Sequence, residues 1–395
     1  MESVTVMHEV KTREQRKALN SWAKNGYCGS IIAGTGFGKS RCGVLAVCHV
    51  IDNVNKSETK HEARALVLVP TTQLQDQFTE EFSKWGKDSY LSNIEVLCYQ
   101  SAYKLVDEHY DIVVCDEVHL GLSPQYGKFF ENNKYDSLLC LTATLPEEEE
   151  YRIKLKELAP VDYQISIDKC VELGLVSPYE VHCLPITLTD EEAKDYKKVN
   201  NKFVYWKYQL GQFDAFNEAK RALANKNAPP EKKQAAAQFY NCIRTRKKIV
   251  DHAHNKIEGL TEIIEDHPEE KIIVFGGANA FTNELAFANE EVATIYHSAR
   301  TKKQRTQALE DFRDGTKRVL CSTKALNQGF DVPDASVGVI CGLTSKSLSM
   351  IQRVGRLIRF KEDKIGKIYI LYVKDSQEEK WLNNSVQKLK NVVWH

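Results

Sequence analysis

One ten-residue run near the start of the sequence constrains the fold of this chain more than any other feature. Residues 31–40 read IIAGTGFGKS, so an apolar strand passes through a glycine-rich turn to a lysine and a hydroxyl where a helix begins. Glycines let successive backbone N–H groups point inward, and the helix N-terminus adds partial positive charge. The run therefore predicts a phosphate-binding loop between a buried strand and a helix of an α/β fold.

The residues of this loop are expected to share the binding of a triphosphate. Lys39 reaches the β- and γ-phosphates, and the hydroxyl of Ser40 is placed to ligate Mg²⁺. Ala33 stands where the strict pattern G-x-x-x-x-G-K-S/T has its first glycine, and an ordinary glycine-rich turn is the alternative interpretation. The Gly-Lys-Ser ending favours the phosphate site. The residues expected to contact the nucleotide are Gly34, Thr35, Gly36, Phe37, Gly38, Lys39 and Ser40.

Length and composition indicate the class of protein. A chain of 395 residues exceeds one compact core, so two or three domains are expected. Its eleven cysteines show neither a C-x-x-C pair nor zinc-type spacing, which predicts reduced core residues rather than disulfides or a metal site. No apolar run approaches the length of a membrane span, and the N-terminus has no signal-peptide core. These features predict a monomeric cytoplasmic protein (host cytoplasm if viral) that does not bind membranes.

The formal net charge is zero, from 54 basic and 54 acidic residues. A nucleic-acid partner often leaves a basic excess, and the whole chain has none. Local basic grooves remain compatible with this balance, because what matters is where the charges lie in space.

Short apolar runs alternate with amphipathic stretches along most of the chain, which predicts parallel sheets with helical crossovers. Two such series occur, so we expect one α/β domain over residues 1–165 and another over 166–395. The strands are expected at residues 30–33, 65–69, 94–98, 112–115 and 137–141, and then at 271–275, 293–296, 318–321, 337–341 and 367–373. Helices are expected to begin near Lys39, Thr72, Ser101, Thr301, Lys324 and Ser347, and a last helix-like stretch at residues 377–395.

Residues from about 189 to 250 are highly charged and almost free of strand signals, so they predict an insert of two or three helices. Its aromatic cluster is expected to form the small core of the insert, with base stacking as the alternative. Residues 244–248 (RTRKK) fit either phosphate contacts or a solvated helix face. The aromatic residues are Phe203, Tyr205, Trp206 and Tyr208.

A second motif follows the apolar strand at residues 111–115 and reads Asp116-Glu117-Val118-His119. Acidic residues at the tip of a buried strand face a neighbouring phosphate loop. There Asp116 can hold Mg²⁺, and Glu117 can orient and deprotonate the attacking water. A surface turn is the alternative, which the phosphate loop upstream disfavours.

These two motifs belong to an ordered set. The further members are residues 69–74 (VPTTQL), 99–101 (YQS), 142–144 (TAT), 322–333 (STKALNQGFDVP) and 352–359 (QRVGRLIR). The set resembles the superfamily 2 helicases and translocases of the DExH branch, and most of all the XPB/UvsW-like group, which includes phage recombination helicases. It spans nearly the whole chain except the insert.

The resemblance implies two RecA-like domains that share one ATP site. Arg356 and Arg359 would lie on one helix face and reach the γ-phosphate, and Gln352 would contact the phosphate or the attacking water. Gly329 and Asp331 would line the cleft. The residues implied to touch the sugar-phosphate backbone are Thr72, Gln73, Gln100, Thr323 and Lys324, and those implied to couple the nucleotide state to the rest of the domain are His119, Thr142 and Thr144.

Two departures from the family pattern bear on function. Gln15 is the candidate for the adenine-reading glutamine, but Thr12 stands where the family has an arginine; the alternative is a polar residue on an N-terminal helix. Residues 331–352 leave no room for a long strand-separating hairpin, so duplex translocation, branch migration and limited unwinding all stay open.

The sequence thus predicts an ATP-dependent nucleic-acid motor, with single-stranded or branched DNA favoured over RNA by the resemblance alone. An ATP-gated remodelling protein that binds a protein partner through the insert is the main alternative. A P-loop kinase is the third candidate, but it explains neither the second α/β series nor residues 352–359.

Overall fold

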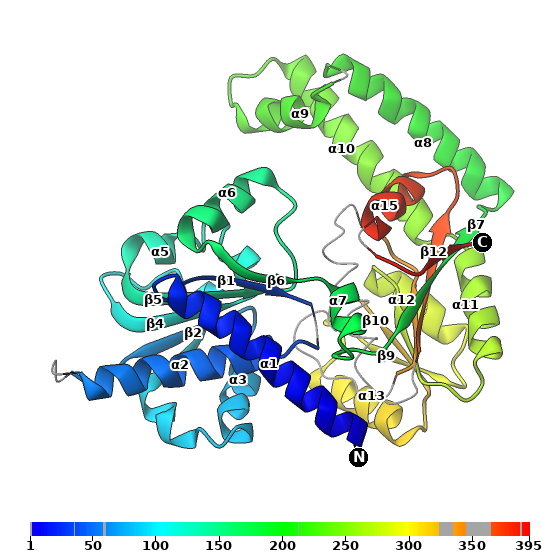
Figure 1. Ribbon diagram of the computed structural model, residues 1–395. Helices are drawn as coiled ribbons and strands as arrows, with labels where there is room; N and C mark the ends of the chain where they lie inside the picture. Colours follow the sequence, from blue (N-terminus) through cyan, green and yellow to red (C-terminus); the bar gives the residue numbers. More distant parts are fainter. Residues whose placement is uncertain are drawn as a thin grey trace.

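The computed structural model describes residues 2–34, 36–57, 61–211, 213–323, 335–344, 365–387 and 389–395, with the backbone alone at residues 2–7 and at Gln73. Two α/β bodies lie side by side, and three helices project from the second of them (Figure 1).

The first body is a six-stranded parallel sheet in the order β3-β2-β4-β5-β1-β6. Its strands are β1 (Cys28–Ala33), β2 (Ala65–Val69), β3 (Ile94–Cys98), β4 (His109–Asp116), β5 (Lys134–Thr142) and β6 (Val161–Ile165). Its helices are α1 (Glu2–Lys24), α2 (Lys39–Lys56), α3 (Thr72–Lys84), α4 (Tyr99–Ala102), α5 (Lys128–Asn132) and α6 (Glu149–Leu158), with 3-10 turns at η1 (Asp88–Asn93) and η2 (Val118–Leu120). Because the strands are parallel, the loops that follow them gather at one edge of the sheet.

The second body is a seven-stranded sheet in the order β13-β7-β12-β11-β8-β10-β9, with parallel pairing throughout. Its strands are β7 (Tyr179–Ile186), β8 (Ile272–Phe275), β9 (Ala293–Tyr296), β10 (Val319–Ser322), β11 (Val337–Ile340), β12 (Gly366–Val373) and β13 (Val392–Trp394). The helices packed with it are α11 (Asn255–Asp266), α12 (Asn279–Phe287), α13 (Lys302–Asp314) and α15 (Gln377–Val386). The connection between the two sheets contains α7 (Ile167–Glu172).

The predicted α/β class with two parallel sheets is confirmed, and β2, β3 and β9 coincide with the expected ranges. Three strands were not expected, namely β6, β7 and β13. The last of these corrects the expectation for residues 377–395, where the helix ends at Val386 and a short strand then pairs with β7. The helices expected to begin near Lys324 and Ser347 lie outside the described residues.

The predicted insert consists of α8 (Asp190–Gln209), α9 (Ala215–Ala224) and α10 (Pro230–Asp251). Thr189 caps α8 in a reciprocal capping box with Glu192, which fixes the point where the chain leaves the sheet. The aromatic cluster divides: Phe203 and Trp206 pack into the small core of these helices, whereas Tyr205 and Tyr208 are exposed.

Two members of the basic run at residues 244–248 have partners within the chain. The guanidinium of Arg246 lies 4.3 Å from the centroid of the Phe203 ring, so it packs against the insert core. Lys247 Nζ binds both carboxylate oxygens of Asp251 and the carbonyl of Leu343. Phosphate contact and a solvated face both stay predictions for this run, since the Lys247 side chain is 37% exposed.

One cluster of buried apolar side chains runs from the first sheet through the α7 segment into the second sheet. Its members include Ile31 on β1, Ile167 and Leu175 in the connection, and Ile340 on β11. This core fixes the edge at which the phosphate loop lies. All eleven cysteines are unpaired, and all but Cys28 are buried. In the described part of the chain, no helix combines the length and apolar character of a membrane span.

Candidate functional site

The phosphate-binding loop leaves the C-terminal end of β1 and enters α2 at Lys39. Gly36 and Gly38 have φ angles of 93° and 88°, in the left-handed region that favours glycine. A Cβ atom at Gly36 would collide with the side chain of Val176, and one at Gly38 would collide with the amide nitrogen of Gln15. Both glycines are therefore required by backbone conformation and by the space around them.

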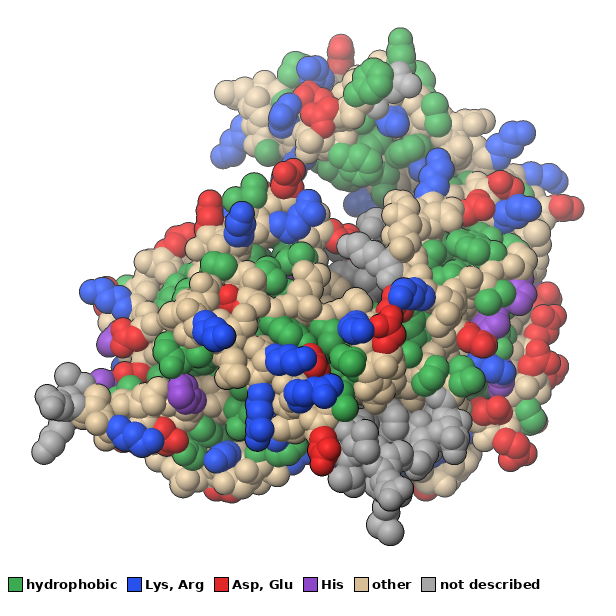
Figure 2. All heavy atoms as spheres, viewed as in Figure 1, with side chains coloured by type: hydrophobic (Ala, Val, Ile, Leu, Met, Phe, Trp, Pro, Cys, Tyr) green, Lys and Arg blue, Asp and Glu red, His purple; other side chains and the backbone are tan. Residues whose placement is uncertain are grey.

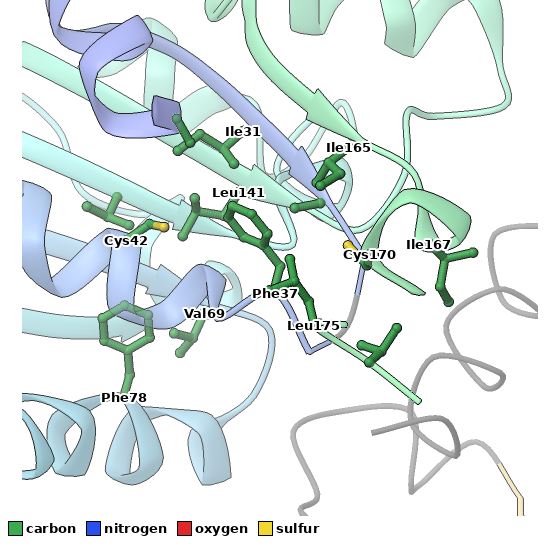
Figure 3. Packing of buried hydrophobic residues seen from close by; sticks show 14 of the residues in the cluster. Ile31, Phe37, Cys42, Val69, Phe78, Leu141, Ile165, Ile167, Cys170 and Leu175 are labelled. Carbon is green, nitrogen blue, oxygen red and sulfur yellow. The ribbon is translucent and has the colours of Figure 1, made fainter. Parts of the chain in front are cut away.

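Phe37 anchors the loop to the core. Its side chain is fully buried and its ring centroid lies 5.7 Å from that of Tyr163 on β6. Figure 3 shows the ring pointing into the cluster formed by β1, β5, α2 and the α7 segment. The side chain of Phe37 is thus unavailable to a nucleotide, and only its backbone faces the loop.

Lys39 lies inside the curve of the loop. Its Nζ donates a hydrogen bond to the carbonyl oxygen of Ala33, at 2.8 Å. Since this contact uses a backbone carbonyl, the methyl group at position 33 does not disturb it. Ser40 follows in the first turn of α2.

The acidic motif lies two strands away, because β5 separates β4 from β1 in the sheet. Burial raises the pKa of Asp116 to about 7; the charge of Glu117 adds to this, and the nearby Lys39 opposes it. The hydroxyl of Tyr99 donates to the carbonyl oxygen of Asp116, at 2.9 Å, which holds the end of the strand. Glu117 then adopts left-handed backbone angles of φ 49° and ψ 53°. Such a backbone conformation is strained for a residue other than glycine and turns the chain sharply after β4.

The residues expected to couple the site to the rest of the domain are brought together at Glu117. The hydroxyl of Thr142 lies 3.4 Å from Glu117 Oε2 and 3.1 Å from the carbonyl oxygen of Thr144. His119 Nδ1 lies 3.4 Å from the same carboxylate oxygen. The end of β5 and the acidic motif therefore form one connected group.

Gln15 lies beneath the loop. Its Nε2 donates to the carbonyl oxygen of Phe37 at 2.7 Å and approaches that of Gly38 at 3.4 Å. Its Oε1 accepts a hydrogen bond from Arg41 Nη1 at 2.8 Å, and the same nitrogen donates to Thr12 at 2.9 Å. Arg41 on α2 thus places a guanidinium beside Thr12. With 1 % of its surface exposed, Gln15 holds the loop in this structure, and its contact with a base stays a prediction.

The residues expected to touch nucleic acid follow the C-terminal ends of their strands. Thr72 begins α3 after β2, with Gln73 next to it, and Gln100 lies in α4 directly after β3. Thr72 and Gln100 are exposed, whereas Thr323, which follows β10, is buried. In the first body, these positions share the edge that carries the phosphate loop.

Several expected site residues lie outside the described residues. Thr35 is the one such residue within the phosphate loop. The others belong to the second body, where the structure describes the strand ends before them, at Ser322 on β10 and Ile340 on β11. They are Lys324, Gly329, Asp331, Gln352, Arg356 and Arg359.

Sequence reasoning missed three residues that shape the site, namely Arg41, Tyr99 and Val176. Tyr99 was read only as part of the YQS run, and Val176 lies in a connection without a motif. Arg41 stands directly after the Gly-Lys-Ser ending, which places it on the first turn of α2 and was the available signal.

Two family models match this chain. The type III restriction enzyme res subunit model matches residues 9–147, and the helicase conserved C-terminal domain model matches residues 255–361. The first covers the phosphate loop and the acidic motif, and the second covers the glutamine-arginine run. The chain belongs to the superfamily 2 helicases. Within them its relatives lie in the XPB-like group, as the resemblance predicted.

Three relatives illustrate this placement. A DNA 3'-5' translocase XPB2 of Sulfurisphaera tokodaii is 28% identical over 88% of this chain and 78% of its own length. A DNA 3'-5' helicase XPB of Mycobacterium tuberculosis is 25% identical over 93% of this chain and 61% of its own length. A 51.5 kDa protein of a Lactococcus phage is 24% identical over 81% of this chain and 62% of its own length. The chain thus spans less than two thirds of the second and third relatives.

Two solved structures share the fold. The Pyrococcus furiosus Hef helicase domain superposes with a TM-score of 0.57 at 16% identity, covering 93% of this chain and 96% of that one. A structure of S. cerevisiae Dbp5 bound to RNA and ADP BeF3 gives 0.58 at 17% identity, covering 100% of this chain and 92% of that one. Both support the two-sheet architecture.

Proposed function

We propose that this chain is an ATP-dependent DNA translocase that moves along one strand, and that it acts in branch migration or fork remodelling during DNA recombination. The observation that carries the proposal is the single edge of the first sheet at which the phosphate loop, the acidic motif and Thr142 meet. Membership of the helicase superfamily supports a nucleic-acid-dependent ATPase.

The oxygen ligands at this edge fit Mg²⁺. Asp116 is a carboxylate whose ionised form is disfavoured by burial, and Ser40 supplies a hydroxyl at a helix N-terminus. Oxygen ligands of this type are those that Mg²⁺ binds in nucleotide sites, with phosphates and water completing its shell. Bound there, the ion would neutralise charge on the phosphates.

The chain's own residues would then carry the reaction. Lys39 exchanges its hydrogen bond with Ala33 for one with a phosphate oxygen, and the loop N–H groups hold the remaining charge. Glu117 orients a water for attack on the γ-phosphate and accepts its proton. Thr142, the last residue of β5, contacts Glu117 and so couples hydrolysis to the end of that strand. Arg356 and Arg359 would reach the γ-phosphate from the second body. Closure of the two bodies would therefore depend on the presence of the γ-phosphate.

Movement follows from the difference in ATP affinity between a closed and an open arrangement of the two bodies. ATP favours closure because both bodies hold the γ-phosphate, and hydrolysis removes that link. Contacts to one strand, made at the ends of β2, β3 and β10, would alternate between the bodies. Thr72 and Gln100 are exposed, as such contacts require. The protein is proposed to act as a monomer.

The local charge of the insert supports nucleic-acid binding, although the net charge of the whole chain is zero. Over α8 to α10, residues 190–251, there are fourteen lysine and arginine residues against eight acidic ones, four of which lie at the start of α8. Figure 2 shows lysine and arginine side chains over the projecting helices, together with hydrophobic ones. Tyr205 and Tyr208, which are 54% and 70% exposed, lie on α8 among them. Basic surfaces with exposed aromatic rings bind phosphate backbones and unstacked bases, so the charge favours nucleic acid over a protein partner here.

DNA is preferred over RNA as the track because the XPB relatives are named DNA translocases and helicases. An RNA helicase is the second candidate, since a splicing RNA helicase of Lodderomyces elongisporus is 21% identical over 82% of this chain. The polarity proposed is 3'-5', as those DNA relatives are named.

Two variants test the catalytic assignment. Lys39→Ala should abolish ATP turnover, and Glu117→Gln should retain ATP binding while lowering the turnover number at least a hundredfold. Glu108→Gln is the matched control, because Glu108 directly precedes the opposite end of β4. If Glu117→Gln turned over ATP at the wild-type rate, the assignment of the general base would be wrong.

Displacement of a third strand from a DNA triplex tests movement on duplex DNA. The wild type should displace it in the presence of ATP, and Lys39→Ala should not. Displacement without ATP would contradict a motor.

A further inference from the structure

We propose that Arg41 is a positioning residue that fixes the amide of Gln15, and that Gln15 in turn sets the shape of the phosphate loop and hence the affinity for the triphosphate. The inference rests on the proposed ATPase function. It assigns to this pair a role toward the phosphates rather than the base.

Arg41 reaches across from α2 to α1. Its Nη1 lies 2.8 Å from Gln15 Oε1 and 2.9 Å from Thr12 Oγ1, so one nitrogen serves two acceptors on consecutive turns of α1. Gln15 then lies 2.7 Å from the carbonyl oxygen of Phe37 through its Nε2. The contacts form a single path from Arg41 through Gln15 to the loop.

The orientation of the Gln15 amide follows from the chemistry of its neighbours. A guanidinium only donates hydrogen bonds, and a backbone carbonyl only accepts them. Oε1 must therefore face Arg41, and Nε2 must face Phe37. Because Gln15 is 1% exposed, water does not compete for either end. If Arg41 loses its donors, the amide oxygen is left buried with fewer partners, and the amide is free to turn.

Trp85 keeps Arg41 in place. The guanidinium carbon lies 4.2 Å from the centroid of the Trp85 ring, and the indole N–H donates to Glu81 at 3.0 Å. An ammonium group would keep the electrostatic attraction to the ring, but only the planar guanidinium also stacks on it. The ring at the end of α3 thus helps to fix the direction of the arginine.

Gln15 acts where the loop is most constrained. Gly38 has a φ of 88°, and a Cβ atom there would collide with Gln15 Nε2. The amide therefore packs directly against the residue before Lys39. Turning it would release the carbonyl of Phe37 and the curve of N–H groups that receives the phosphates, without moving Glu117.

Arg41→Met tests the role, because methionine keeps the aliphatic length and loses every donor. The dissociation constant for a fluorescent (mant) derivative of ADP and the KM for ATP should both rise about tenfold, the effect of one charge-assisted hydrogen bond, with kcat within about twofold. Arg41→Lys, which keeps a charged donor but loses the planar stacking on Trp85, should recover part of the affinity. Arg64→Met is the matched control, since that arginine also lies over an aromatic ring, 4.9 Å from the centroid of Tyr110, but precedes β2 at the opposite sheet edge.

A double variant asks whether Arg41 acts through Gln15. Gln15→Met should raise the same constants about as much, and Arg41→Met with Gln15→Met should be no worse than either alone. The rise should also be equal for ATP and GTP, because the loop contacts phosphates. Three results would each overturn the proposal. They are effects of the two substitutions that multiply in the double variant, a loss of affinity that is confined to ATP, and a fall in kcat while KM stays unchanged.

The outcomes separate this inference from the proposed function. Absence of binding and of ATP hydrolysis in the wild-type protein would reject the ATPase itself. Wild-type binding that Arg41→Met leaves unchanged would reject the positioning role alone.

Discussion

The pair formed by Lys256 and Glu378 offers the sharpest test of how the second body is held together. Lys256 lies on α11 and Glu378 on α15, and both side chains are fully buried. Lys256 Nζ lies 2.9 and 2.8 Å from the two carboxylate oxygens, and 2.7 Å from the carbonyl oxygen of Cys341 after β11. Glu378 also accepts a hydrogen bond from the backbone of Val373 at the end of β12. Two strand ends and two helices therefore depend on this one pair.

Lys256→Met removes one partner and leaves the other buried. Breaking a buried ion pair in this way costs about 3–5 kcal/mol of unfolding free energy, because a carboxylate stays in the core without its cation. The Cys341 carbonyl loses its hydrogen-bond donor as well. This costs about 1 kcal/mol, which is included in the cost of breaking the pair. Against a total stability of roughly 5–15 kcal/mol for a folded domain, the change is large.

The double variant Lys256→Met with Glu378→Gln should recover about 2 kcal/mol. The neutral amide keeps an oxygen for the Val373 N–H and no longer buries a charge. Urea unfolding followed by circular dichroism measures each free energy. Lys154→Met is the matched control, because its pair with Glu150 on α6 is exposed, and its midpoint should not change. The single variant Glu378→Gln is measured as well. If the double variant lost as much unfolding free energy as Lys256→Met and Glu378→Gln lose in sum, the reasoning would be refuted.

Two further predictions concern charge away from the ATP site. Burial raises the pKa of Asp162 from 3.8 to about 6, so the folded state disfavours its ionised form and stability falls as the pH rises through 6. Asp162→Asn should therefore stabilise the protein at pH 7.5 by about 1 kcal/mol after allowance for partial exposure, and not at pH 4; an equal gain at both would contradict this. On the insert, Lys197→Glu, Lys198→Glu and Lys202→Glu together should weaken DNA binding at least tenfold and flatten its salt dependence, with DNA-independent ATP turnover unchanged. Unchanged DNA affinity would reject the insert as part of the track.

Local signals in the sequence were sufficient for much of the fold. Residues 65–69 and 94–98 are short apolar runs bounded by polar residues, so β2 and β3 were predictable to the residue. Two of the three missed strands lack that signal. β6 reads VDYQI, with mixed polar and apolar residues, and β7 contains Pro185; both depend on neighbouring strands for their conformation.

The candidate site divides in the same way. The phosphate loop and the acidic motif are contiguous runs whose chemistry is readable from residue type and spacing. The contact of Arg41 with Gln15 joins residues 26 apart, and that of Lys256 with Glu378 joins residues 122 apart. No periodicity connects such pairs, because they meet only when separate helices pack. The burial of Phe37 shows the same limit, since its motif position gives no information on which way the ring points.

The stimulation of ATP hydrolysis by nucleic acid tests the central claim most directly. The ATP turnover of the wild-type protein is measured alone and with single-stranded, duplex and forked DNA, and with RNA of the same sequences. A motor of this family should hydrolyse ATP at least tenfold faster with DNA than alone, with RNA weaker, and Lys39→Ala should stay inactive throughout. The same turnover with and without every nucleic acid would contradict the account.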